Sequence, residues 1–349
     1  MNDTNRPALK RLGNLQRRTV TMSTEDLVRT APLDGKGLPL VIQPAVAGLS
    51  LPAWVENHRD RIDAELRRHG ALLFRSFDQP RVEQFEQAVR AISGEMLEYK
   101  ERSSPRHAVS GRIYTSTDYP ADQPIFLHNE NSYQFTWPRR IFFFCATPAA
   151  EGGETPIADV RRVYERIRPE VRERFAAKKW MMVRNYGQGF GLPWTTVFQT
   201  EDWEEVEDYC RRNGIEVEWR EGNSLRTRAV RNAVAKHPDT GEVLWFNHAT
   251  FFHVSTLSPA VRDGLLAQFP EDELPANTYY GDGSPIEPEV LDHLRACYEA
   301  ETVRFPWEKG DLLMLDNMMV AHGRAPYKGE RRILVAMAQP TSWTELVSL

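Results

Sequence analysis

The sequence predicts a mixed α/β protein with an all-β core, a β-sandwich or jelly roll, that carries flanking helices and a long helical insert. Short strand-like segments occur toward both ends of the 349-residue chain, and a helix-bearing section separates them. No strand-like segment is followed by a glycine-rich phosphate loop, which excludes a nucleotide-binding βαβ unit. No internal repeat, low-complexity tract or Ser/Gly linker divides the chain, so a single domain is expected.

The composition is that of a soluble globular protein, with 41% hydrophobic and 27% charged residues. The net charge of −5 argues against nucleic acid as the main partner. No apolar run approaches the roughly 20 residues of a membrane helix, so no membrane partner is expected. Cys145, Cys210 and Cys297 are far apart and form no CxxC pair, which predicts neither disulfides nor a zinc knuckle and fits a reducing cytoplasm.

The N-terminal part of the chain is expected to be a basic arm followed by the domain. Residues 1–36 begin with a stretch rich in arginine that has no apolar h-region, so they predict a loosely ordered arm before a domain of residues 37–349. Apolar residues at helical spacing in 54–69 predict an amphipathic helix closed by a glycine. Strands are expected in 38–46 and 71–77, and a second helix over 81–93.

The middle of the chain mixes strands and helices. The nearly continuous apolar run 140–147 predicts a strand buried on both faces, and 160–179 predicts a helix that breaks at Pro169. We expect an insert from about 186 to 305, with a hairpin in 229–247 and helix starts marked by Thr200, Ser258 and Pro288, before short strands return.

The stretch IFLHNENSY, residues 125–133, is the centre of the functional prediction. It is expected to be a strand, in which alternate side chains share a face, so His128 and Glu130 point the same way. An imidazole and a carboxylate side by side are two of the three ligands of a facial iron(II) site, which needs one more histidine. Taken alone, the pair is weak evidence, because a surface-facing polar pair on an edge strand is the simpler interpretation.

His322 supplies the third ligand, and an arginine follows it at a spacing that a hairpin can close. His322 comes after an apolar strand and a DN turn, and Arg332 opens another apolar strand ten residues later, beyond the turn-forming PYKGE. A hairpin of that length returns Arg332 to the neighbourhood of His322. A buried arginine needs an acid, and its planar fork suits a carboxylate. Arg331 is expected to face the other way, into solvent.

With the motif GGET, these residues resemble the iron(II)/2-oxoglutarate dioxygenases of the TauD/TfdA type, and within them the SyrP-like amino-acid β-hydroxylases of nonribosomal peptide clusters. The resemblance implies a double-stranded β-helix of the clavaminate-synthase kind. It also implies iron held by His128, Glu130 and His322, and the distal carboxylate of 2-oxoglutarate on Arg332 with a hydroxyl bond from Thr155. The stretches that carry the closer similarity are ERSSPR, YTSTDYPADQ, HNENSY, GGETPIADVR, RNYGQGFGLPW, FFHVSTLSP and LDNMMVAHGR.

The activity that this resemblance implies is hydroxylation of an unactivated C–H bond with iron(II), 2-oxoglutarate and O2. The expected substrate is an amino acid or a derivative of one in specialised metabolism, such as antibiotic biosynthesis, either free or bound to a carrier protein. Related halogenases carry Ala or Gly where Glu130 stands, so the carboxylate favours hydroxylation. Desaturation or cyclisation with the same cofactors, and a cupin-like protein that binds metal without turnover, remain as alternatives.

The substrate-binding residues are less well defined. Taurine-type members carry a second arginine four residues after the keto-acid arginine, where this chain has Ala336, so a taurine-like substrate is not expected. Candidate substrate contacts are Ser116, Asn131, Arg184 and Phe190, with ordinary packing as the alternative for each.

Two further features have a functional and a structural interpretation. His248 and His253 could compete as iron ligands, but their spacing fits neither one strand face nor one helix face, which favours pocket-wall or core positions. The basic segment 160–179 could dock an acidic carrier protein, although a solvated helix with pairs such as Glu170–Arg174 is the simpler interpretation. The sequence leaves open whether the protein is a homodimer.

Overall fold

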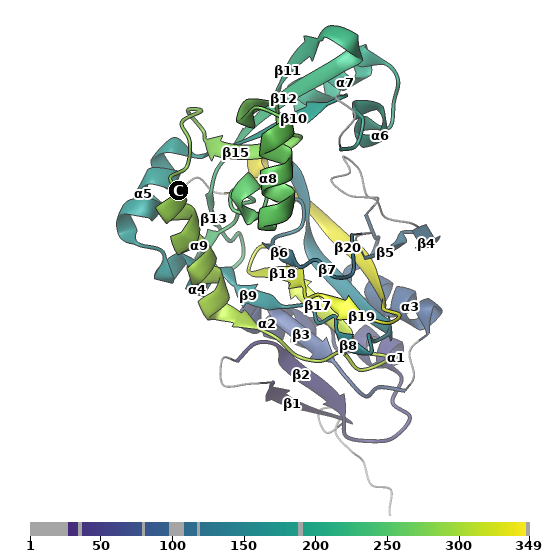
Figure 1. Cartoon of the computed structure of the whole chain (residues 1–349). Helices are drawn as coiled ribbons and strands as arrows, with labels where there is room; N and C mark the ends of the chain where they lie inside the picture. The colour runs from purple at the N-terminus through teal and green to yellow at the C-terminus, as the bar shows by residue number, and fades with distance from the viewer. Residues whose placement is uncertain are drawn as a thin grey trace, which may run out of the picture.

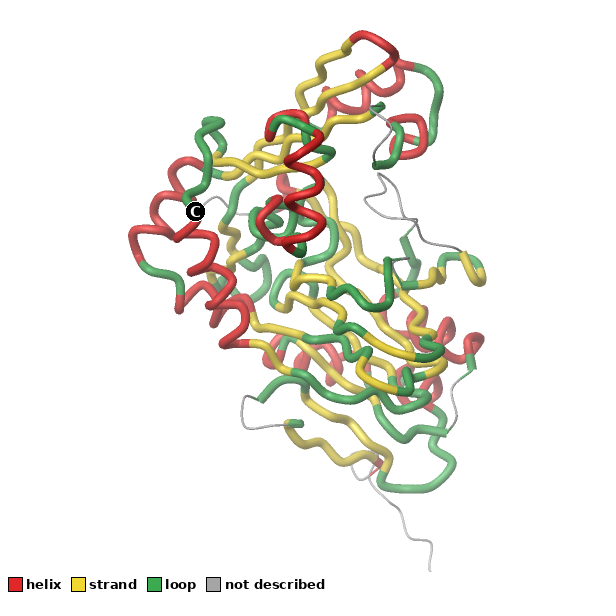
Figure 2. Tube along the Cα trace, viewed as in Figure 1, coloured by secondary structure: helices red, strands yellow, loops and turns green. Residues whose placement is uncertain are grey.

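The computed structural model describes residues 27–33, 37–78, 81–97, 108–116, 119–187 and 191–346. An eight-stranded sheet forms the larger layer of the core, as Figures 1 and 2 show. Its strands run in the order β1 (Val28–Pro32), β2 (Leu40–Pro44), β3 (Ala71–Phe74), β17 (Leu312–Asp316), β7 (Thr136–Thr147), β20 (Arg332–Ser342), β5 (Ile113–Thr115) and β4 (Ala108–Ser110). Strands from both ends of the chain therefore lie next to one another, which the predicted jelly roll requires.

A smaller sheet packs against the first. Its order is β16 (Thr302–Val303), β9 (Ile157–Asp159), β18 (Val320–Arg324) and β6 (Ile125–His128), and β8 (Glu151–Gly152) pairs with β19 (Tyr327–Lys328) nearby. Phe143 and Val335 of the large sheet share one apolar cluster with Ile157 and Val320 of the small one. Two sheets packed face to face through such a cluster confirm the predicted jelly-roll core.

Helices cover the outer face of the large sheet. They are α1 (Leu51–Glu56), α2 (Arg59–His69) and α3 (Val82–Ser93). Phe85 of α3 stacks on Phe144 of β7 with ring centroids 5.2 Å apart, within the cluster that joins these helices to the sheet. The helix predicted over 54–69 is divided in two at residues 57–58, where the His58 backbone is not helical (φ −131°); the His58 imidazole hydrogen-bonds the Trp54 carbonyl at 2.7 Å and stacks on the Trp54 ring.

The predicted N-terminal arm is partly wrong. Residues 28–32 form β1, which pairs antiparallel with β2, and Val28 is only 6% exposed. A backbone ladder and a buried valine hold this segment to the sheet, so the arm cannot extend to residue 36. Residues 1–26 and 34–36 lie outside the described residues.

The insert begins earlier than predicted and is not purely helical. Helices α4 (Val160–Arg166) and α5 (Pro169–Lys178) follow β9 directly, with the expected break before Pro169. The next strand, β10 (Trp180–Tyr186), belongs to a four-stranded sheet ordered β11 (Ile215–Arg220), β12 (Ser224–Arg231), β10 and β15 (Ala276–Tyr280), which lies at the opposite end of the molecule from β1 (Figure 1).

The remaining elements of the insert follow the predicted start signals closely. The hairpin β13 (Val234–Lys236) and β14 (Val243–Trp245) is present, α8 (Pro259–Gln268) follows Ser258, and α9 (Pro288–Glu301) starts at Pro288. Helix α7 (Trp203–Arg212) is capped by the Asp202 carboxylate, two residues beyond the predicted Thr200. The other short elements are α6 (Trp194–Phe198) and the 3₁₀ turns η2 (Glu221–Asn223), η3 (Val254–Thr256), η4 (Glu271–Glu273) and η5 (Trp343–Glu345). None of the helices in the described ranges is both long and apolar enough to span a bilayer.

Candidate active site

The two predicted histidine ligands meet because their strands are neighbours. Strand β6 pairs antiparallel with β18, and His128 stands directly opposite His322 in the register. Facing side chains of an antiparallel pair have Cβ atoms about 5 Å apart, so the topology alone brings the two imidazoles together. Their ring centroids are 4.5 Å apart.

Glu130 reaches the same point from a turn and not from the strand. Strand β6 ends at His128, whereas the prediction extended it to residue 133. The Asn317 side chain holds the turn from both sides: its Oδ1 accepts from the Glu130 amide at 2.7 Å, and its Nδ2 donates to the Glu130 carbonyl at 2.9 Å. The predicted pairing of His128 with Glu130 is therefore present, but the reason given for it, strand alternation, is wrong.

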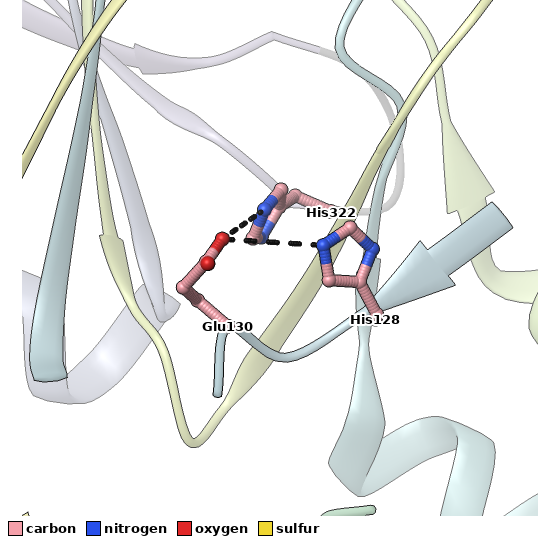
Figure 3. A group of neighbouring side chains, drawn as sticks. All are labelled: His128, Glu130 and His322. Atoms are coloured by element: carbon pink, nitrogen blue, oxygen red, sulfur yellow. Dashed lines mark ion pairs between the residues drawn. The ribbon is translucent and has the colours of Figure 1, made fainter. Parts of the chain in front are cut away.

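The three side chains form a compact set of metal-ligand atoms (Figure 3). Glu130 Oε2 lies 4.0 Å from His128 Nε2 and 3.6 Å from His322 Nε2. All the ligand atoms lie within 4.8 Å of one another, and within the described ranges no other group of three His, Cys, Asp or Glu residues has this geometry. Two imidazoles and one carboxylate on one face of a metal are the set that suits iron(II) with open positions.

The surroundings orient His128 for metal binding. Its Nδ1 lies 2.9 Å from the Phe126 carbonyl, which can only accept, so Nδ1 carries the proton and the Nε2 lone pair faces Glu130. Glu130 and His322 are 3% and 4% exposed, which keeps bulk water from the site. The arrangement therefore fits a divalent ion with respect to donor type, tautomer and burial.

A small pocket of about 30 Å³ adjoins the triad, and an arginine lies at its far side. The Arg331 Nε donates to the Gly153 carbonyl at 2.8 Å, and its Nη atoms lie 3.4 Å from Thr155 Oγ1 and 3.5 Å from Ser116 Oγ. We call this space, between the triad and Arg331, the iron pocket.

The arginine assignment from the sequence is off by one residue. Arg332 is exposed at the start of β20, whereas Arg331, predicted to be solvated, lines the iron pocket. The register between β20 and β7 shifts between Arg332 and Ile333, and a bulge of this kind reverses the faces expected from simple alternation. The position four residues after Arg331 is Val335, so the iron pocket still lacks the second arginine of the taurine-type members.

The electrostatics around Arg331 favour an anion. Burial and the neighbouring Arg324 guanidinium lower the pKa of Arg331 to about 10, so it remains a cation at neutral pH. Arg324 is itself 5% exposed and donates to the Tyr119 and Gln123 carbonyls at 2.9 and 2.8 Å. Two guanidinium groups in one buried region repel each other, and a bound carboxylate would relieve that repulsion.

Thr155 lines the iron pocket beside Arg331. It is 2% exposed, and its Oγ1 accepts from Trp307 Nε1 at 3.1 Å, which leaves the hydroxyl proton available for a carboxylate. Ser116, one of the candidate substrate residues, lines the iron pocket together with Arg331. Trp307 was not predicted, since nothing in FPWEKG distinguishes it from a core tryptophan.

The other candidate residues lie elsewhere. Asn131 is buried next to Glu130 but lines a separate cavity. Arg184 lies in β10 of the insert, where its guanidinium stacks on the Tyr186 ring, and it does not line the iron pocket. Phe190 lies outside the described residues.

Neither rival histidine joins the ligand group. His248 is 2% exposed, with its ring centroid 5.4 Å from that of His128, and its Nδ1 lies 2.5 Å from Ser132 Oγ. Burial lowers the pKa of His248 well below the ordinary value, so it is a neutral wall of the site. His253 caps the 3₁₀ turn η3 through Ser255. The pocket-wall and core interpretation is therefore the correct one for both.

Family comparisons agree with this geometry. Residues 30–337 match the family model described as "Taurine catabolism dioxygenase TauD, TfdA family". The chain is 43% identical over 279 residues to the dapdiamide synthesis protein DdaC of Enterobacter agglomerans, covering 80% of this chain and 85% of that protein. It is 28% identical over 324 residues to the clavaminate synthase-like protein At3g21360 of Arabidopsis thaliana, covering 88% and 95% respectively.

A solved structure extends the comparison to the fold. PvcB, described as an Fe, alpha-ketoglutarate dependent oxygenase from an isonitrile synthetic pathway, superposes with a TM-score of 0.53 at 16% identity, covering 90% of this chain and 93% of that one. At this identity the likeness shows the fold alone, whereas the family match spans most of the chain. This protein therefore belongs to the TauD/TfdA family of oxygenases that depend on iron(II), 2-oxoglutarate and O2.

Proposed function

We propose that this oxygenase hydroxylates an unactivated C–H bond of an amino acid or an amino-acid derivative in specialised metabolism. The observation that carries the proposal is the convergence of His128, Glu130 and His322 on one point beside a pocket with Arg331 at its far side. The 43% identity to a protein named for dapdiamide synthesis supports the metabolic setting. The carboxylate at position 130 supports hydroxylation, because it occupies the coordination position that a halide would need.

The chain's own residues have separable roles. His128, Glu130 and His322 hold the metal, Asn317 fixes the turn that carries Glu130, and Arg331 with Thr155 binds the distal carboxylate of 2-oxoglutarate. The positions of the hydrogen-bond donors in the iron pocket support the roles proposed for Arg331 and Thr155. When bound, iron(II) with 2-oxoglutarate and O2 supplies the oxidising power for C–H cleavage.

Apolar residues exclude water from this chemistry. Phe143 lies against His322 with ring centroids 4.9 Å apart, and Phe251 lies against His128 at 4.5 Å. Ile333 and Val335 complete the apolar part of the iron pocket. A dry site of this kind strengthens the charge interactions of the triad and protects reactive species from side reactions.

The experiment that tests the proposal has two stages. The purified protein is first titrated with iron(II) and 2-oxoglutarate without oxygen, and the charge-transfer absorption of the complex is followed. Oxygen is then admitted with a panel of amino acids and derivatives, and succinate and product mass are measured. A product heavier by one oxygen atom is expected; loss of two hydrogens instead would assign desaturation or cyclisation.

The carrier-bound form of the substrate has less support than the free form. Several cations of the basic segment 160–179 already have partners within the chain: Arg166 pairs with Glu301, Arg174 with Glu287 at 2.5 Å, and Lys178 with Asp282 at 2.8 Å. The expected Glu170–Arg174 pair is replaced by the contact of Arg174 with Glu287, the N-cap residue of α9. Such internal pairing leaves less positive charge for an acidic carrier protein.

A further inference from the structure

The insert hairpin of β13 and β14 carries a buried histidine whose two ring nitrogens are both used. His237 is 1% exposed and follows β13 directly. Its Nδ1 accepts from the backbone amides of Asp239 and Thr240, each at 3.2 Å, and its Nε2 lies 3.1 Å from Asp316 Oδ2. Because two N–H groups point at Nδ1, the ring proton is on Nε2 and is donated to the Asp316 carboxylate. One imidazole therefore shapes the hairpin turn and also reaches the core.

Asp316 closes the turn between β17 and β18. It is 4% exposed, and its Oδ1 accepts from the Met318 and Met319 amides at 3.0 and 3.2 Å. Among the residues that the structure describes, His237 is the only donor to the other carboxylate oxygen, Oδ2. A buried carboxylate oxygen without a donor is costly, so His237 stabilises Asp316 in the position that closes this turn.

The turn that Asp316 closes connects two of the proposed metal ligands. Asn317, the next residue of the turn, accepts from the Glu130 amide at 2.7 Å and donates to the Glu130 carbonyl at 2.9 Å. The chain then continues into β18, which carries His322. A shift of this turn therefore moves Glu130 and His322 relative to one another. Since a binding site needs its ligands held to within about 0.5 Å, the contacts that fix the turn matter for the metal.

A second contact joins the same hairpin turn to Asn317. Asp239, two residues after His237, forms an ion pair with Arg139 of β7, and the Arg139 carbonyl accepts from the Asn317 amide at 2.8 Å. The side chains of this ion pair are 24% and 41% exposed, so water screens their attraction. The buried contact of His237 with Asp316 is therefore the stronger of the two links between the insert hairpin and the turn.

We infer that His237 is a positioning residue for the metal centre: by donating to Asp316, it lets the insert hold the turn that fixes Glu130. It acts through Asp316 and Asn317 and not by contact with the metal. This inference rests on the proposed function, in which Glu130 is a metal ligand, and it adds a residue of the insert to that site. The alternative is that His237 serves only the hairpin turn, through Nδ1. The two roles belong to different nitrogens, so substitutions can separate them.

His237→Gln and His237→Asn form the matched pair for this test. The glutamine Nε2 can take the place of the imidazole Nε2 and donate to Asp316, whereas the asparagine Oδ1 can take the place of Nδ1 and accept from the hairpin amides. Iron(II) affinity of the full chain is measured without oxygen, at saturating 2-oxoglutarate, by the charge-transfer absorption. Affinity should fall about tenfold in His237→Asn and less than about threefold in His237→Gln. Equal affinities in the two variants, or the larger loss in His237→Gln, would overturn the inference.

Glu242→Gln is the control for a loosened hairpin. Glu242 precedes β14 and forms another ion pair of the hairpin, with Arg161 at 3.2 Å, but it does not contact Asp316. This variant should bind iron(II) like the wild type. A loss of about tenfold in Glu242→Gln would show that any loosening of the hairpin has the same effect, and the assignment to His237 would fail.

Asp316→Asn tests the same contact from the other side and serves if His237→Asn does not fold. The new side chain keeps one oxygen as acceptor for the Met318 and Met319 amides, but its amide group faces the Nε2–H of His237 with a second donor. Iron(II) affinity should fall about tenfold. Wild-type affinity in Asp316→Asn would overturn the inference.

Product mass separates this inference from the proposed function. If the wild type binds iron(II) but gives no oxygenated product, the proposed hydroxylation fails and the role of His237 stands on the binding data. If the wild type hydroxylates a substrate while His237→Asn and His237→Gln bind iron(II) alike, only the role of His237 fails.

Discussion

Two buried asparagines on either side of the same turn behave in opposite ways. Asn317 uses its whole side chain within the protein, accepting from the Glu130 amide and donating to the Glu130 and Pro138 carbonyls. Asn131 is nearly as buried, yet its Oδ1 has no partner and its φ is 58°. The fold therefore pairs the whole side chain of Asn317 and leaves the Oδ1 acceptor of Asn131 unpaired.

The two cavities near this turn are built differently. The iron pocket is lined by core strands and their connections, and its polar side chains Thr155 and Arg331 contact one another. A second cavity of about 440 Å³, whose wall includes Trp137, Met337 and Tyr209, is closed partly by α7 of the insert. The shape of the first cavity therefore depends on the core, whereas that of the second depends also on how the insert packs.

The largest expected effect comes from the metal centre. Glu130→Ala removes the one anionic ligand, so iron(II) affinity should fall by a factor of about 100 or more, and succinate formation should be lost. Iron titration followed by the charge-transfer absorption, and succinate assays in air, measure both. Glu330→Ala, at an exposed turn position, is the control. Normal turnover in Glu130→Ala would show that this carboxylate is not a ligand.

The next effect distinguishes the neighbouring arginines. Arg331→Gln should raise the KM for 2-oxoglutarate about 100-fold, since two charge-assisted hydrogen bonds together contribute about 3 kcal/mol. Arg332→Gln is its matched control and should change KM less than about twofold, because Arg332 is exposed. Steady-state succinate formation at varied 2-oxoglutarate measures both variants. A large rise in the KM of Arg332→Gln with little change in that of Arg331→Gln would instead assign the 2-oxoglutarate contact to Arg332.

The metal ligands and the two neighbouring arginines show what could be predicted from the sequence. His128, Glu130 and His322 were identifiable because residue type and a DN turn mark them, even though β6 ends before Glu130. Choosing between Arg331 and Arg332 depended on strand alternation, and the bulge in β20 defeats that rule.

The second cavity could not have been predicted at all. Its wall joins β7, β20 and α7, which are far apart in the chain, and the packing of the insert decides where they meet. An unpaired acceptor such as Asn131 Oδ1 can be recognised only in the folded structure, because it depends on which neighbouring groups do not reach the side chain.

A smaller effect is expected at Asn317, where structure and metal binding are linked. Asn317→Ala leaves the buried Glu130 amide and carbonyl without their partners, so the free energy of unfolding should fall by about 3 kcal/mol. Iron(II) affinity should fall about 10- to 100-fold, because the turn no longer fixes the ligand. Urea unfolding of the metal-free protein and iron titration measure the two effects. A loss of stability without a loss of iron affinity would separate Asn317 from the metal site.

The smallest effect is expected at Asn131 and completes the comparison. Asn131→Gly removes the side chain and relieves the left-handed φ, but it adds freedom to the unfolded chain, so the free energy of unfolding should change by less than about 1 kcal/mol. Urea unfolding beside Asn317→Ala gives the contrast directly. If Asn131→Gly destabilised the protein as much as Asn317→Ala does, the Asn131 side chain would contribute to stability as Asn317 does, and the contrast between the two asparagines would fail.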